Sequence, residues 1–213
     1  YQVGRIINAL KDKGMYDDTL IVFASDHGDM MGDYNAIGKR TMVDSSCRVP
    51  LIVKYPGKGH ELRSEACSLV DIAPTLLSYA GADFDKEEFD GVDLFAQNER
   101  KYVFSQHGCG DVGMYMVTDG TNKLIYRAAE DRYFFFDHIP EEHECYDEDS
   151  PVVREMKALL DGYMNSDVNK AKSSVTYEKV TKTHPHYPGR MDHLYLHKEE
   201  MAAIPNEDKI DLD

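Results

Sequence analysis

The segment TLIVFA, residues 19–24, is the feature of this sequence that most restricts the fold. It is a continuous run of apolar and β-branched residues without alternating polar side chains. Such a run is typical of a strand that is covered on both faces inside an α/β sheet. A helix is predicted before it, over about residues 1–13, and a helix that leads into a buried strand is the unit of a parallel sheet. The sequence therefore predicts an α/β fold.

Further elements of the same kind follow along the chain. The segment VPLIVKYPG, residues 49–57, predicts a second buried strand that ends at a Pro-Gly turn. Residues 68–81 predict a helix, because Pro74 suits its first turn and Gly81 suits its end. Residues 25–48 are rich in glycine and aspartate and predict a long loop between the two strands. Loops of this length are usually functional or disordered.

The sequence changes character after residue 93. Four short strand-like runs, YVFSQH, MYMVTDG, KLIYRA and YFFFDH, are separated by turn residues and predict a small antiparallel sheet. A helix over about residues 152–164 should pack on this sheet with one apolar face. The sequence thus predicts three parts: an α/β core (1–93), a small antiparallel α+β subdomain (94–164) and a polar C-terminal extension (165–213).

The charge balance excludes several classes of partner. The chain has 24 Lys and Arg against 39 Asp and Glu, which gives a formal net charge of −15. A field of this sign repels nucleic acids and anionic membranes, and no run of eighteen apolar residues predicts a membrane span. The four cysteines lie far apart, so neither a disulfide scaffold nor a zinc ribbon is indicated. An anionic substrate would need a local cluster of cations or a metal ion.

Asp26 and His27 stand directly after the first predicted strand. Ligands of α/β sheets bind outside the carboxyl ends of strands, and a turn at Gly28 would let both side chains reach one divalent cation. The alternative is that Asp26 caps a turn and His27 is a surface histidine bonded to it. Lys39, which follows Gly38, favours the site, because a metal and a lysine together neutralise two oxygens of a tetrahedral anion.

The segment DDTLIVFASDHGDMMGDYNAIGKRTMVDSSCRVPLIVKYPG resembles the second-half signature of the sulfatases, a family of the alkaline phosphatase superfamily. The later runs SLVDIAPTLLSYAG, FDGVDL and YVFSQH resemble the same family, so the resemblance covers about residues 4–164. It implies an alkaline-phosphatase-like sheet sandwiched by helices, and the hydrolysis of a small-molecule or carbohydrate sulfate ester. It also implies that Asp26 and His27 are metal ligands and that Lys39 is a catalytic residue that binds a sulfate oxygen.

The resemblance also implies cofactors and a further part of the protein. Calcium is the usual metal, with manganese and magnesium as alternatives, and the nucleophile is a formylglycine made from a cysteine or serine. The motif C-x-[PA]-x-R, in which the nucleophile forms, is absent, since RVP follows Cys47. We therefore expect an N-terminal part of the same protein to supply the nucleophile and complete the fold, and this chain alone to be inactive. Tyr34 replaces a usual histidine, and Asp44 aligns with a usual glutamate.

Weaker signals remain as secondary expectations. His107 follows a predicted strand and is a candidate for lining the substrate pocket. Four histidines of the extension predict a surface or oligomer-contact cluster and not a metal site: His184, His186, His193 and His197. The extra loop acids Asp29, Asp33 and Asp44 are interpreted as turn-forming or solvated. Two other functions stay open, namely a phosphate or phosphonate monoester hydrolase of the same superfamily and a catalytically inert binding module.

Overall fold

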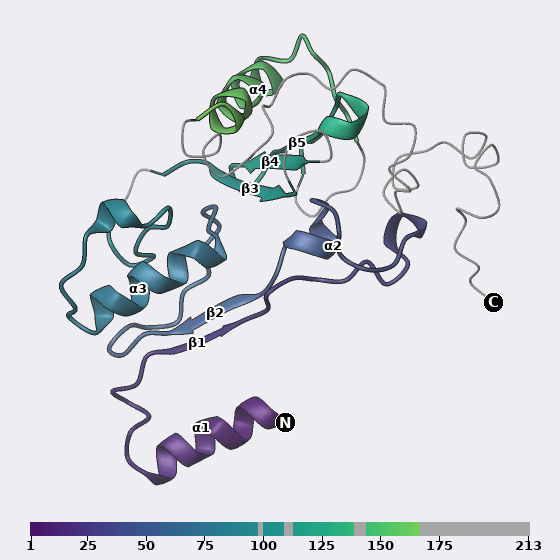
Figure 1. The fold of residues 1–213 in the computed structure, drawn as a ribbon. Helices are drawn as coiled ribbons and strands as arrows, with labels where there is room; N and C mark the ends of the chain where they lie inside the picture. The colour runs from purple at the N-terminus through teal and green to yellow at the C-terminus, as the bar shows by residue number, and fades with distance from the viewer. Residues whose placement is uncertain (98–99, 109–112, 139–143, 167–213) are drawn as a thin grey trace. The chain divides into compact units, whose positions relative to one another are not determined.

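A computed structural model of the chain describes four stretches of residues: 1–97, 100–108, 113–138 and 144–166. The chain folds as two compact units. The first unit consists of residues 1–26 and 49–100, and the second of residues 27–48 and the chain from Lys101 onward (Figure 1). Most of the predicted C-terminal extension, including its four histidines, lies outside the described residues.

The first unit contains helices and one pair of strands. Its elements are α1 (Gln2–Asp12), β1 (Ile21–Ala24), β2 (Leu51–Lys54), η2 (Leu69–Asp71), α3 (Ile72–Tyr79) and η3 (Lys86–Glu88). Gly14 and Gly81 follow α1 and α3 with φ angles of 67° and 66°, the left-handed conformation that ends helices. Pro74 stands in the first turn of α3, where a missing N–H costs nothing. These helix predictions are confirmed.

The pairing of β1 with β2 differs from the prediction. The two strands form an antiparallel pair in which Ile21 faces Lys54 and Ala24 faces Leu51. The predicted parallel arrangement is wrong for this pair, because the chain leaves β1 and enters β2 at the same end of the sheet. Residues 25–50 therefore form a long connection, and the pairing of Ala24 with Leu51 holds its two ends together.

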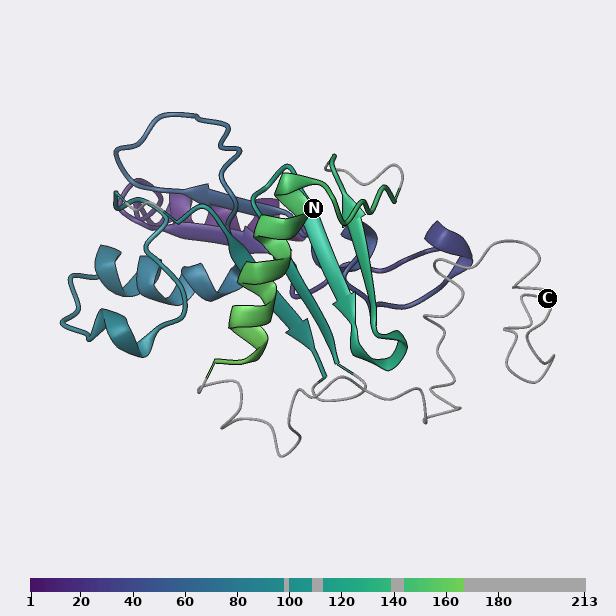
Figure 2. The ribbon, with the colours of Figure 1, turned by 90° about the horizontal axis from the view of Figure 1, so that it is seen from above.

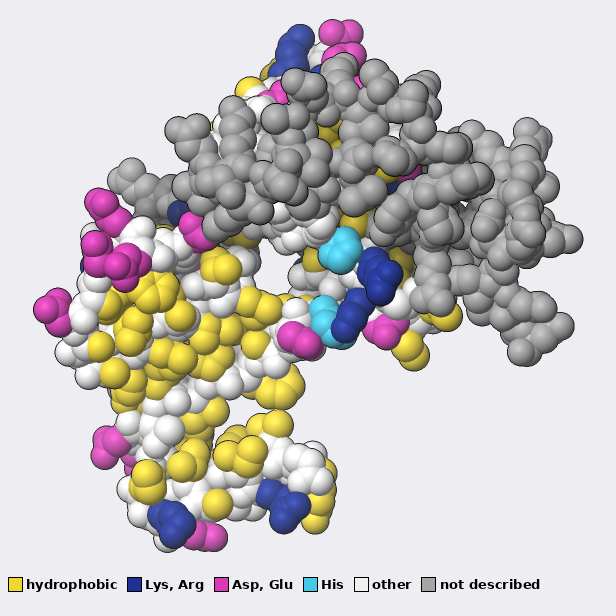
Figure 3. Space-filling view, viewed as in Figure 1, with side chains coloured by type: hydrophobic (Ala, Val, Ile, Leu, Met, Phe, Trp, Pro, Cys, Tyr) yellow, Lys and Arg dark blue, Asp and Glu magenta, His cyan; other side chains and the backbone are white. Residues whose placement is uncertain are grey.

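The apolar run of β1 predicts a strand that is covered on both faces. The described residues do not cover the β1–β2 pair in this way. Phe23 of β1 is 43% exposed and Ile52 of β2 is 63% exposed. Val3 and Ile6 on the apolar face of α1 are also exposed. Figure 3 shows hydrophobic side chains gathered over the first unit. The strand prediction is confirmed, whereas no layer of described residues covers these apolar side chains.

A buried carboxylate organises the start of α3. Asp71 is 0% exposed, and its two oxygens each accept a 2.6 Å bond from the Arg100 guanidinium. The backbone N–H groups of Ser68 and Val92 donate to the same carboxylate at 2.7 and 2.9 Å. Burial alone would raise the pKa of Asp71, but the Arg100 and backbone donors outweigh it and hold that pKa below its ordinary value. The loop that ends at Arg100 is thereby attached to α3.

This carboxylate should make the stability of the chain fall in acid. Because its pKa is lower in the folded state, its contribution is complete above the unfolded pKa of about 3.9 and is lost as the pH falls through the folded value. Urea denaturation of wild type and Asp71→Asn should give free energies of unfolding that converge between about pH 5 and pH 2. The exposed control Asp12→Asn should differ little from wild type throughout. A constant gap for Asp71→Asn would contradict this prediction.

The second unit is built around a four-stranded antiparallel sheet. Its strands are β3 (Val103–His107), β4 (Met114–Thr118), β5 (Lys123–Arg127) and β6 (Arg132–Phe136), paired in chain order. Its helical elements are η1 (Asp33–Asn35), α2 (Asp44–Cys47), η5 (Ala128–Glu130) and α4 (Pro151–Met164). The predicted antiparallel sheet and its helix are confirmed. Among the described residues, every helix is too short or too polar to cross a lipid bilayer.

Both faces of this sheet are covered. On one face α4 packs with Val153, Met156 and Leu160 against Tyr115 and other inward residues of the strands (Figures 1 and 2). The other face is covered by residues 27–48, which we call the site loop. This loop contributes four buried side chains, Met30, Ala36, Met42 and Val43, to a core with Met114, Met116, Ile125, Phe134 and Phe136. The sheet therefore supports the loop that carries the predicted site.

Candidate functional site

The predicted metal ligands follow β1. Asp26 is the last residue of the first unit before the site loop and is exposed. His27 is the first residue of the site loop and is half-buried. Lys39, twelve positions further in the same loop, is exposed. His27 and Lys39 both lie within the second unit.

The hydrogen bonds of His27 determine which tautomer its ring adopts. Nδ1 lies 2.7 Å from the backbone oxygen of Gly28, and Nε2 is in contact with Nζ of Lys39. A carbonyl oxygen can only accept, so Nδ1 must carry the proton. An ammonium can only donate, so Nε2 must offer its lone pair. Both contacts are satisfied when the ring proton is on Nδ1 and the lone pair is on Nε2, the arrangement in which Nε2 can bind a cation.

Backbone contacts fix the position of Lys39. The Gly38 N–H donates to Oδ1 of Asp29 at 3.1 Å, and the Gly38 oxygen accepts from the Met30 N–H at 2.8 Å. Gly38 has a φ angle of 93°, which other residues adopt only with strain. The backbone oxygen of Lys39 itself accepts a bond from the Ser46 hydroxyl. The Lys39 side chain thus starts from a fixed backbone and reaches His27.

Gly28 permits a close approach between the two ends of the site loop. Its N–H donates to the Ser46 oxygen at 2.7 Å. A Cβ atom at position 28 would lie 2.0 Å from the backbone oxygen of Ser45, far inside van der Waals contact. Only glycine fits here without moving the backbone. The position of the His27 backbone is consequently tied to residues 45 and 46.

The extra acids of the loop have structural partners. Asp29 accepts from Gly38, as described above, and Asp33 accepts a bond from the Ser45 hydroxyl. Asp44 is not solvated, since it forms an ion pair with Lys123 of β5, whose side chain is 3% exposed. The sequence interpretation missed Lys123. Alternation along β5 would have placed it on the same face as Ile125, where a buried ammonium needs an acidic partner.

The donors fit a divalent cation only in part. A carboxylate at position 26 and an imidazole lone pair at position 27 are suitable ligands, and Lys39 is suited to an anion. Calcium takes six to eight oxygen ligands, so these two residues cannot fill its shell. Within the stretches that the structure describes, no group of three or more His, Cys, Asp or Glu is arranged to hold a metal ion. A calcium ion at these two residues would need further ligands.

His107, the predicted substrate contact, is the last residue of β3 and is exposed. It faces Met114 across the β3–β4 pair. Its role in binding stays a prediction.

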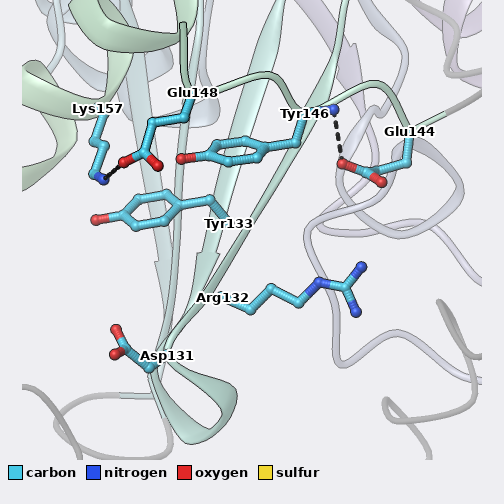
Figure 4. A pocket seen from close by; sticks show the side chains of 7 residues that line it. All are labelled: Asp131, Arg132, Tyr133, Glu144, Tyr146, Glu148 and Lys157. Atoms are coloured by element: carbon cyan, nitrogen blue, oxygen red, sulfur yellow. Dashed lines mark hydrogen bonds and ion pairs between the residues drawn. The ribbon is translucent and has the colours of Figure 1, made fainter.

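Figure 4 shows an open pocket on the second unit, and none of the candidate site residues lines it. It is lined by seven side chains: Asp131, Arg132, Tyr133, Glu144, Tyr146, Glu148 and Lys157. Lys157 pairs with Glu148 at 3.3 Å and also lies 4.8 Å from the centre of the Tyr133 ring. Burial, followed by the nearby Asp161, raises the pKa of Tyr133, so its hydroxyl stays protonated and donates to Asp161. Lys157, Glu148 and Tyr133 thus have partners within the protein.

The chain is similar to sulfatases and to a phosphonate monoester hydrolase. Residues 1–82 match the family model Sulfatase. An arylsulfatase of Clostridium perfringens is 31% identical over 155 residues, which cover 67% of this chain and 32% of that protein. Arylsulfatase K of Bos taurus is 29% identical over 199 residues, 84% of this chain and 36% of that protein. The chain thus spans about a third of the length of these relatives.

The fold of the chain is also similar to that of a solved structure. The phosphonate monoester hydrolase of Silicibacter pomeroyi matches with a TM-score of 0.65 and 26% identity, over 84% of this chain and 42% of that one. The match includes a mixed α/β arrangement like the one described above. The motifs around β1 and β2, the family model and the relatives agree, and the chain is a member of the sulfatase family of the alkaline phosphatase superfamily.

Proposed function

We propose that this chain supplies part of the active site of a sulfatase-type hydrolase of sulfate esters. In this proposal Asp26 and His27 bind a divalent cation, most favourably calcium, and Lys39 binds an oxygen of the sulfate group. His107 would line the pocket for the rest of a small-molecule or carbohydrate ester. The observation that carries the proposal is the arrangement of His27, whose Nδ1 lies 2.7 Å from the Gly28 oxygen while its Nε2 contacts the Lys39 side chain.

The chemistry follows from these charges. A bound cation would supply positive charge to the ester oxygens. His27, held by the Gly28 oxygen, would keep its lone pair directed at the cation without a proton to displace. Lys39 would donate to a sulfate oxygen, whose negative charge is thereby stabilised within a chain of net charge −15. Gly28 and Gly38 would hold both side chains at fixed positions during turnover.

The remaining ligands and the nucleophile, a formylglycine, would come from polypeptide outside this sequence. Two observations support this part of the proposal. The chain spans about a third of the length of its relatives, and the exposed apolar side chains of α1, β1 and β2 form a surface that further chain would cover. We refer to the chain together with that polypeptide as the complete enzyme.

Cation binding and turnover by the complete enzyme test the proposal. Calcium titration by calorimetry should show one specific site, and hydrolysis of an aryl sulfate should require it. His27→Ala and Asp26→Asn should each weaken binding by more than about 100-fold, since even residues that only orient metal ligands cost 10- to 100-fold. Exposed residues of the same types provide controls, because His60→Ala and Asp17→Asn should leave binding and turnover unchanged.

Two results would contradict this view. Wild-type calcium affinity and turnover in His27→Ala would remove His27 from the site. Hydrolysis by the 213-residue chain alone, abolished by His27→Ala, would show that the nucleophile is not outside this sequence. A complete protein without any specific divalent cation site would instead favour the inert binding module.

Phosphorus ester hydrolysis is the second candidate function. It is favoured by the match to the phosphonate monoester hydrolase of Silicibacter pomeroyi, which covers 84% of the chain, the same share as the match to arylsulfatase K of Bos taurus. The values of kcat/KM for an aryl sulfate and an aryl phosphonate, measured side by side, decide between the two.

A further inference from the structure

Lys123 is a buried lysine on the loop-covered face of the sheet. It is 2% exposed and opens β5. Along this strand Leu124 and Tyr126 face α4, whereas Ile125 packs with the site loop. Alternation therefore directs Lys123 to the site-loop face. A buried ammonium costs folding free energy unless polar partners compensate it. Its contacts therefore show which segment of the chain Lys123 holds in place.

Three contacts of the ammonium lie within residues 42–47 of the site loop. Its Nζ forms an ion pair with Oδ1 of Asp44, donates to the backbone oxygen of Met42 at 3.2 Å, and lies 3.8 Å from Sγ of Cys47. Asp44 is itself only 13% exposed in its side chain. Lys123 thus attaches the α2 turn to the sheet by charge as well as by packing.

The same turn contacts the backbone of Lys39 and of Gly28, the residue that follows His27. The Ser46 hydroxyl donates to the oxygen of Lys39, and the Ser46 oxygen accepts from the N–H of Gly28. The Gly28 oxygen in turn accepts from Nδ1 of His27. A displacement of the turn would therefore move the carbonyl that fixes the His27 tautomer and the backbone from which Lys39 extends.

We propose that Lys123, through Asp44, is a positioning residue that sets the tautomer of His27 and the placement of Lys39. This inference rests on the proposed function for its effect on catalysis. Its effect on the His27 ring does not, since Lys123, the α2 turn, Gly28 and His27 all lie within the second unit. The residue touches neither substrate nor cation, and it acts through the α2 turn.

Nitrogen-15 NMR of the His27 ring in the 213-residue chain tests the inference directly. Wild type should show a single tautomer, with the proton on Nδ1. Lys123→Met should show a mixture of both tautomers. Lys123→Met/Asp44→Leu replaces the buried pair by apolar side chains of similar size, a change that is often neutral for stability. This double variant should regain the wild-type thermal midpoint but not the single tautomer.

The same variants extend the test to the complete enzyme. The double variant should bind calcium about 10- to 100-fold more weakly than wild type, as expected for the loss of residues that orient ligands. The exposed pair Lys101 and Glu155, 3.3 Å apart, provides the control Lys101→Met, which should keep the wild-type spectrum and affinity. A double variant with a wild-type tautomer would overturn the inference. Absence of calcium binding in wild type would overturn the proposed function alone.

Discussion

Lys39→Met should lower kcat/KM of the complete enzyme for an aryl sulfate by about 10²- to 10³-fold, the usual effect of removing one fixed donor to a developing negative charge. Methionine keeps the length of the side chain and removes the ammonium that contacts His27. Calcium affinity should not weaken, because Lys39 donates to the Nε2 atom that we propose as the cation ligand. Steady-state kinetics and calorimetry on the same preparation measure both quantities.

The neighbouring residue offers a matched control for Lys39. Arg40 is also exposed and has no role in the proposed site, so Arg40→Met should retain turnover close to wild type. An equal loss of turnover in both variants would show that any positive charge near the loop contributes, and not Lys39 specifically. A normal rate in Lys39→Met would remove Lys39 from the proposed mechanism.

The second large effect concerns the buried pair of the first unit. Arg100→Met should lower the free energy of unfolding by about 3–5 kcal/mol, the cost of leaving a buried charge without its partner. Asp71, at 0% exposure, would keep only the two backbone donors of Ser68 and Val92. Because domains of this kind are stable by about 5–15 kcal/mol, a large part of the stability would be lost. Urea denaturation measures the change.

Arg63 is the control for this prediction. Its side chain is 39% exposed, and it pairs with Glu61 and Glu65 at 3.5 and 3.4 Å. Exposed pairs contribute about 0–1 kcal/mol, so Arg63→Met should change the free energy of unfolding little. A similar, small effect of both substitutions would mean that Arg100 does not compensate the Asp71 charge.

Local patterns were sufficient to predict most elements of the fold. Helix α4 follows from its apolar spacing, and β3 to β6 follow from short apolar runs between turn residues. The glycine that ends each of α1 and α3 acts within its own turn, so neighbouring residues determine it. The sulfatase family was recognisable for the same reason, since its motifs are contiguous segments.

Pairings between distant segments were not predictable in this way. The apolar run of β1 indicates a strand, but its antiparallel partner and the exposure of Phe23 depend on what lies beside it. The ion pair of Asp44 with Lys123 joins residues 79 positions apart. Nothing near Asp44 in the sequence shows that the acid is buried, and it was therefore interpreted as a turn-forming or solvated group.

The sequence predicts which residues are candidates for the site, but it does not predict how their side chains contact one another. Asp26, His27 and Lys39 were chosen from their places after a strand and after a glycine. The structure brings His27 and Lys39 into contact, and their roles as cation ligand and sulfate contact stay predictions. The sequence does not predict that a sheet supports the site loop, because Met30, Met42 and Val43 are far in the sequence from the strands that cover them.

The packing of the site loop on β3 to β6 has a consequence for biosynthesis. The ribosome adds residues 27–48 well before the strands that cover Met30, Met42 and Val43. Contacts of such long sequence separation form late and slowly, so the loop stays unshielded until Phe136 has left the exit tunnel. A nascent chain stalled before β5 would carry every residue of the site loop and still lack the lysine that binds Asp44.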